Sequence, residues 1–282
     1  MEKCRRAFLG AAVAGLAGAA SAGTAQAAQP SEARFVQVWS CGGLAEAMVP
    51  AHVRFTEKTG IKVVYTGAFA GALGKSLLSG SGSTEVFCGR VLQLAKNLRK
   101  AGKMLQFRPL CFTNYGIAVP KGNPKGIKGL EDLAPKGFRL AMAPLASPPG
   151  SAAVMAILKM SGMTEKLMPN VLDKRASCIQ STVKEVCDGR ADAMIVEQRI
   201  CRFERFAPYL DYIPLPAGLQ PAGPLTFTVG VMAGAHDPEA AQIYQDWITS
   251  PEGQAFFEKA GFISAYTEEG QALVKKLEVY DA

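Results

Sequence analysis

Hydrophobic and polar residues follow two different periods along this chain of 282 residues. Short runs rich in Val, Ile and Phe with a period of two predict strands, and longer segments with apolar residues at helical spacing predict helices. In the first half, strands are predicted at 34–39, 61–65, 85–88 and 110–119, with helices at 44–58, from 71 to about 78, and after 88. In the second half, strands are predicted at 138–142, 177–179, 193–196 and 225–232, with helices from about 151 and at 181–188, 238–248 and 252–260.

The alternation of strands and helices predicts an α/β fold of two lobes, each a mostly parallel sheet flanked by helices. Residues 33–112 and 225–282 are predicted to form the first lobe, and residues 113–224 the second. Two strands would then cross between the lobes as a hinge. This arrangement places a ligand in the cleft between the lobes, at the carboxyl ends of the strands.

The first 27 residues have the pattern of a signal peptide. Three basic residues precede an unbroken run of small and apolar residues at 7–20, and Ala-Gln-Ala at 25–27 forms a small-x-small cleavage site. Arg5 and Arg6, followed by Phe8 and Leu9, resemble a twin-arginine export signal, although an ordinary secretory signal explains the same residues. Both interpretations predict export to the periplasm.

The charge of the mature chain disfavours nucleic acid as a partner. The net charge is +7, and without residues 1–27 it is +5, because 28 basic and 23 acidic residues remain. No stripe of Lys and Arg appears, so the mild positive charge favours an anionic ligand instead. The two histidines, His52 and His236, have neither triad nor metal-ligand spacing, so no enzyme and no cofactor are predicted.

Six short segments occur in an order and spacing that together resemble a known family. They are 55–63 (FTEKTGIKV), 71–73 (GAL), 119–124 (VPKGNP), 130–134 (LEDLA), 189–193 (GRADA) and 251–254 (PEGQ). This set resembles the periplasmic molybdate-binding proteins of ABC importers, which have the type II periplasmic binding protein fold. The resemblance implies a monomer that captures a small molecule or an anion such as molybdate or tungstate. It also implies delivery to a membrane permease, with only peripheral contact with the membrane complex.

The resemblance also implies where the ligand lies. The family holds its oxyanion with serine hydroxyls and with main-chain N–H groups at helix starts, which are natural anion sites. The corresponding cleft residues here are Ser40, Cys41, Gly42, Gly43, Ala70, Gly71, Cys88, Gly150, Ile179 and Glu197. The binding serines correspond to Gly43 and Ala70, and an alanine N–H corresponds to a position near Pro149, which has none. The scaffold carries over, but molybdate specificity does not.

Glu197 stands where the family has a binding tyrosine, and its carboxylate would repel an oxyanion unless it is protonated or paired. Arg90 and Arg199 follow strands predicted to reach the cleft, and they are candidates for pairing with an anion or with Glu197. Whether the cleft binds an anion therefore depends on how the charged side chains of Glu197, Arg90 and Arg199 are arranged.

Six cysteines follow residue 27, namely Cys41, Cys88, Cys111, Cys178, Cys187 and Cys201. Four of them, Cys41, Cys88, Cys178 and Cys201, are predicted to line the cleft, and the other two to pack in the core. Disulfides Cys41–Cys88 and Cys178–Cys201 would suit an exported protein. Alternatively, the four thiolates and Glu197 hold a soft metal or metal complex in a metal-handling or redox protein. A third interpretation is that they are buried free thiols that act as small hydrophobic side chains.

Overall fold

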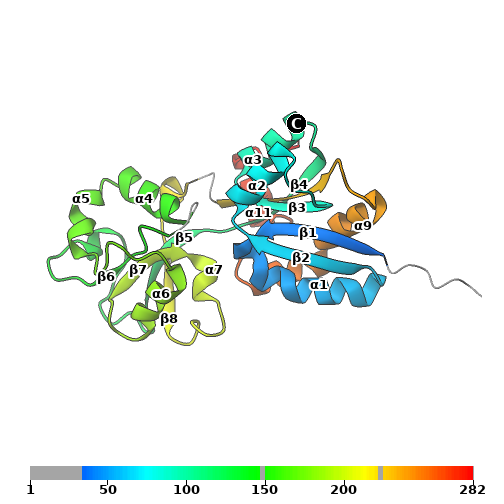
Figure 1. Ribbon diagram of the computed structural model, residues 1–282. Helices are drawn as coiled ribbons and strands as arrows, with labels where there is room; N and C mark the ends of the chain where they lie inside the picture. Colours follow the sequence, from blue (N-terminus) through cyan, green and yellow to red (C-terminus); the bar gives the residue numbers. More distant parts are fainter. Residues whose placement is uncertain (1–33, 147–149, 222–224, 282) are drawn as a thin grey trace, which may run out of the picture. The chain divides into compact units, whose positions relative to one another are not determined.

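The computed structural model describes residues 34–146, 150–221 and 225–281, which form two mixed β-sheets flanked by helices (Figure 1). The predicted signal peptide and Pro149 lie outside these residues. Within the described ranges, no helix combines the length and the apolar character that a membrane crossing requires. The predicted α/β fold class is confirmed.

The larger sheet has six strands in the order β10-β4-β9-β3-β1-β2. Its strands are β1 (Phe35–Cys41), β2 (Lys62–Ala68), β3 (Val86–Arg90), β4 (Met104–Phe112), β9 (Thr226–Met232) and β10 (Ile263–Ser264). Strands β2, β1 and β3 are parallel, whereas β9 is antiparallel to both β3 and β4. The sheet is therefore mixed, because β9 and β10 run against the other four strands.

The smaller sheet has four strands in the order β6-β7-β5-β8. They are β5 (Tyr115–Pro120), β6 (Leu140–Ala141), β7 (Ala193–Glu197) and β8 (Leu210–Pro214). Only β6 and β7 are parallel, and β5 is antiparallel to both β7 and β8. This sheet is also mixed rather than mostly parallel.

Helices cover both faces of each sheet. The helices packed with the larger sheet are α1 (Ala45–Thr59), α2 (Ala70–Ser79), α3 (Leu92–Lys100), α9 (Pro238–Ile248), α10 (Pro251–Lys259) and α11 (Glu268–Lys276). Those packed with the smaller sheet are α4 (Gly150–Met160), α5 (Thr164–Leu167), α6 (Ile179–Cys187) and α7 (Gln198–Cys201). The 3-10 turns are η1 (Gly42–Leu44), η2 (Glu131–Leu133), η3 (Met168–Asn170) and η4 (Ala217–Leu219).

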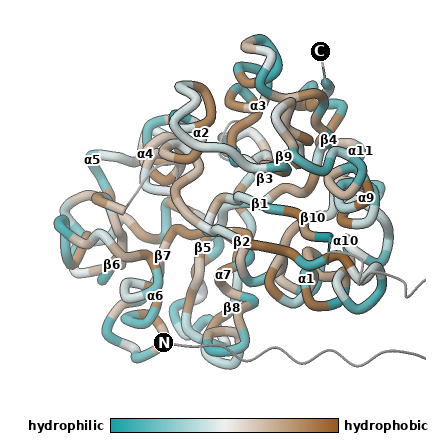
Figure 2. Tube along the Cα trace, turned by 45° about the vertical axis from the view of Figure 1, so that its right-hand side comes forward, coloured by the Kyte–Doolittle hydropathy of each residue, from teal (hydrophilic) through white to brown (hydrophobic). Residues whose placement is uncertain are grey.

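The alternation of side chains along β1 shows how the layers form. Val36 and Val38 face one core together with Met48 and Phe55 of α1, whereas Trp39 faces the opposite core. Helix α1 accordingly changes between hydrophobic and hydrophilic residues along its length (Figure 2). Successive strand residues point to opposite faces, so both faces of the sheet bury apolar side chains.

Two local predictions were wrong. The strand predicted at 110–119 is two strands, β4 and β5, which belong to different sheets and are separated by Thr113 and Asn114. No strand forms at 177–179, because Ile179 begins helix α6 and the Thr182 N–H bonds to the Cys178 carbonyl. Strand β8 and helix α11 were not predicted, since their polar residues obscure the apolar pattern.

Candidate ligand-binding site

A cleft in the structure lies where three α-helices and one 3-10 turn begin. It contains about 790 Å³ of empty space, part of it open to solvent. Its walls are formed by Cys41, Gly42, Gly43, Ala68, Phe69, Ala70, Arg90, Gly150, Ile179, Glu197 and Arg199. Helix α1 approaches the cleft through η1, and helices α2, α4 and α6 begin at wall residues Ala70, Gly150 and Ile179.

The helix starts at this cleft offer main-chain N–H donors. Leu44 precedes α1 and Phe69 precedes α2, and neither side chain can accept a hydrogen bond from the first turn. In contrast, the starts of α9, α10 and α11 are capped by the side chains of Asp237, Ser250 and Thr267. Uncapped helix starts carry partial positive charge and are favourable for anions. The small wall residues allow a ligand to approach these groups closely.

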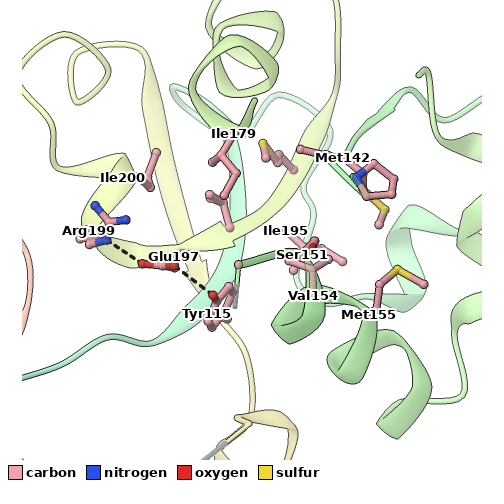
Figure 3. Close-up of a pocket in the computed structure, with 15 residues that line it drawn as sticks. Tyr115, Met142, Ser151, Val154, Met155, Ile179, Ile195, Glu197, Arg199 and Ile200 are labelled. Atoms are coloured by element: carbon pink, nitrogen blue, oxygen red, sulfur yellow. Dashed lines mark hydrogen bonds and ion pairs between the residues drawn. The ribbon is translucent and has the colours of Figure 1, made fainter. Parts of the chain in front are cut away.

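A buried ion-pair cluster forms one wall of the cleft (Figure 3). Arg90 Nη2 lies 2.7 Å from Glu197 Oε1, and Arg199 Nε lies 2.6 Å from Glu197 Oε2. The Tyr115 hydroxyl accepts a hydrogen bond from Arg90 Nη2 and donates one to Glu197 Oε1, both at 3.0 Å. The carboxylate of Glu46 also lies near the cluster, with its Oε2 3.7 Å from Arg199 Nη1, so the two guanidinium groups are balanced by two carboxylates.

The arginines keep Glu197 ionised. Burial alone would raise the pKa of this carboxyl, but the charges of Arg199 and Arg90 outweigh burial and lower its pKa to about 2. Burial, together with the nearby Glu197 charge, raises the pKa of Tyr115, so its phenol stays neutral. Glu197 is therefore paired with two guanidinium groups and does not act on an anion as an isolated carboxylate would.

Arg199 explains why glycine occupies position 43. A Cβ atom at Gly43 would lie 3.1 Å from Arg199 Nη2, so a side chain there would crowd the guanidinium group. The same guanidinium lies over the Phe203 and Phe262 rings, with 5.7 Å and 5.5 Å between its carbon and the ring centroids. The resemblance implies a serine hydroxyl at position 43. In this chain, the guanidinium group of Arg199 lies next to that position instead.

Most of the residues that the sequence assigned to the ligand line this single cleft. Those that do so are Cys41, Gly42, Gly43, Ala70, Gly150, Ile179 and Glu197. Ser40 is buried and bonds the Tyr65 hydroxyl at 2.7 Å, Cys88 is buried in the core, and Gly71 lies one position inside α2. The assignment omitted Arg90 and Arg199 from the wall, although their pairing with Glu197 was considered from the sequence.

The predicted four-thiol cluster is wrong. Cys88 is fully buried beside Val86, Cys178 is exposed at the start of α6, and Cys201 packs in the core of the smaller sheet. All six cysteines in the described part of the chain are free thiols, so neither predicted disulfide forms. Among those same residues, no three metal-ligating side chains come together. The observed arrangement matches the interpretation of buried thiols for Cys41, Cys88 and Cys201.

Thiol titration of the native protein should reveal one fast-reacting cysteine, Cys178. It is exposed, and hydrogen bonds from Ser181 lower its pKa, which increases the reactive thiolate fraction. Burial raises the pKa of Cys201 to about 12, and the other core thiols should likewise react only after unfolding. Reaction with an aromatic disulfide reagent, with and without denaturant, measures this. The Cys178→Ser variant should lose the fast phase; its persistence would contradict the assignment.

The chain matches the sequence model of a family described as bacterial extracellular solute-binding protein over residues 36–263. Among curated proteins, it is similar to a sulfate-binding protein of Synechococcus elongatus. The two are 25% identical over 270 residues, which cover 85% of this chain and 75% of that protein.

Solved structures show the same fold. A substrate-binding domain of a putative molybdenum ABC transporter from Clostridium difficile superposes with a TM-score of 0.68 and 15% identity, covering 82% of this chain and 98% of that one. The periplasmic molybdate-binding protein of Azotobacter vinelandii gives a TM-score of 0.62 and 16% identity, covering 81% and 98%. At these identities the similarity concerns the fold of the chain.

Proposed function

Because the chain belongs to the family of bacterial extracellular solute-binding proteins, we propose that it captures a small anion in the cleft and delivers it to the permease of an ABC importer. The family consists of transporter components that bind solutes, and this protein is not an enzyme. The observation that carries the anion assignment is the pair of buried arginines, Arg90 and Arg199, in a cleft wall where three α-helices and one 3-10 turn begin. The similarity to the sulfate-binding protein of Synechococcus elongatus supports an anionic ligand.

The proposed capture step is closure of two lobes around the anion. Residues 33–112 with 225–282 would form one lobe, and residues 113–224 the other. The chain passes between the two sheets from β4 to β5 and again before β9, and these connections are the proposed hinge. Closure would bury the anion against Arg90 and Arg199, where low dielectric strengthens charge–charge attraction. Residues 1–27 would direct export to the periplasm, with the twin-arginine route as part of this proposal.

A thermal-shift screen at constant ionic strength tests anion capture. The panel contains sulfate, molybdate, phosphate, alkyl sulfonates and carboxylates, with neutral alcohols and divalent cations as controls. An anion present at 100 times its Kd should stabilise the protein by about 2.7 kcal/mol, which gives a saturable rise in Tm. Stabilisation by a soft metal ion and by no anion would contradict the proposal and favour the metal-handling alternative.

A further inference from the structure

An apolar pocket continues from the cleft toward the smaller sheet. It shares Gly150, Ile179, Glu197 and Arg199 with the cleft wall. Its remaining walls are almost entirely apolar and are formed by Tyr115, Met142, Ala143, Pro144, Ser151, Val154, Met155, Met194, Ile195, Val196 and Ile200. Figure 3 shows the charged side chains of Arg199 and Glu197 at one end and Met142, Val154 and Met155 at the other.

The apolar pocket beside the cleft indicates which kind of anion the site binds. A bare tetrahedral oxyanion needs hydrogen-bond donors around its whole surface and gains nothing from an apolar wall. In this chain Gly43 and Ala70 replace hydroxyl donors, so the side-chain donors at the cleft are the guanidinium groups of Arg90 and Arg199. Three methionines line the apolar pocket, and their flexible side chains adapt to the shape of an apolar guest.

The charges of the site also distinguish ligand classes. The two arginines face the two carboxylates of Glu197 and Glu46, so the site has no excess positive charge to balance a doubly charged oxyanion. A guanidinium group presents donors in a planar fork that suits the paired oxygens of a carboxylate or sulfonate. We propose that the ligand is a small organic monoanion, with a carboxylate or sulfonate head in the cleft and a short apolar tail in the apolar pocket. This inference rests on the proposed anion capture and specifies its ligand class.

Calorimetric titration of the purified protein with a homologous series tests the ligand class. The series comprises methane-, ethane-, propane- and butanesulfonate and the carboxylates from acetate to valerate, with sulfate, molybdate and neutral butanol for comparison. One of the two series, sulfonates or carboxylates, should bind more tightly. Within that series, affinity should rise about fourfold with each methylene that becomes buried. Sulfate and molybdate should bind more weakly than the longer organic anions.

The outcomes separate the two proposals. If sulfate or molybdate binds best and a longer tail lowers affinity, the organic class is overturned while anion capture stands. If no anion binds, or if butanol binds as well as butanesulfonate, anion capture itself fails.

Substitutions in α4 test whether the apolar tail of the ligand occupies the apolar pocket. Val154→Phe fills the apolar pocket and should flatten the dependence on tail length, whereas Val154→Ala enlarges the pocket and should shift the optimum to a longer chain. Ala152→Phe is the matched control, because Ala152 is an exposed residue of the same helix and does not line the pocket. Unchanged tail dependence in both Val154 variants, with Tm values showing that they fold, would overturn the assignment of this pocket.

Discussion

Replacing Arg90 with methionine is expected to weaken anion binding about 100-fold and to destabilise the ligand-free protein by about 3–5 kcal/mol. Arg90 has 4% of its surface exposed, and its guanidinium bonds both Glu197 and the Tyr115 hydroxyl. Methionine has a similar length but no charge, so it would leave Glu197 with Arg199 alone. One of the two positive charges of the cleft wall would be removed, and the attraction of the cleft for an anion would weaken.

Two measurements separate these effects. Denaturant unfolding without ligand reports the cost of breaking the buried pair, and calorimetric titration with the best anion of the screen reports binding. Arg175→Met is the control, because Arg175 is exposed in a loop, does not line the cleft and should change neither quantity. Anion affinity that survives in Arg90→Met, in a folded protein, would show that the cluster is not the anion site.

Glu197→Gln is expected to destabilise the protein by about 3 kcal/mol at pH 7 and to alter how stability depends on acid. The folded-state pKa of Glu197 is about 2, below the ordinary value of 4.5, because the charges of Arg199 and Arg90 outweigh burial. Because the folded-state pKa of Glu197 is lower than its unfolded-state pKa, the ionised carboxylate stabilises the folded state at pH values above 4.5. That contribution is lost as pH falls from about 4.5 to about 2, since the unfolded state binds the proton first. Glutamine cannot ionise, so the variant lacks this contribution at every pH.

The measurement is the free energy of unfolding by urea for both proteins between pH 7 and pH 3. The difference between them should be constant above about pH 5 and should shrink below it. Glu165→Gln is the matched control, because Glu165 is exposed on α5 and its replacement should leave the profile unchanged. A difference that stays constant down to pH 3 would contradict an ionised, arginine-paired Glu197.

The sequence was sufficient for elements whose pattern is local. Alternating apolar residues at 34–39 identified β1, and the helix predicted at 44–58 ends as expected, with Gly60 in the left-handed region at φ 73°. Gly43, Ala70 and Ile179 line the cleft, and their role in ligand binding stays a prediction. Small residues between a strand and a helix mark such turns directly in the sequence.

The break between β4 and β5 was not visible in the sequence. Residues 110–119 have a continuous β pattern, and a single apolar run contains no information about which sheet each half joins. The Thr113 N–H bonds to the Leu225 carbonyl, so a segment more than a hundred residues away fixes the point at which the chain leaves the larger sheet. The antiparallel pairing of β9 and β4 likewise comes from long-range contacts rather than from local propensity.

The sequence by itself determined the α/β class, the family resemblance and the helix starts that surround the cleft, because periodicity and turn chemistry are local properties. The tertiary structure decided the chemistry of the site. Arg90 and Glu197 are 107 positions apart, and only the packing of the two sheets joins them in one buried cluster. The same packing buries Cys88 and exposes Cys178, so the thiols do not gather. Charge pairing and burial depend on neighbours in space, which spacing along the chain does not specify.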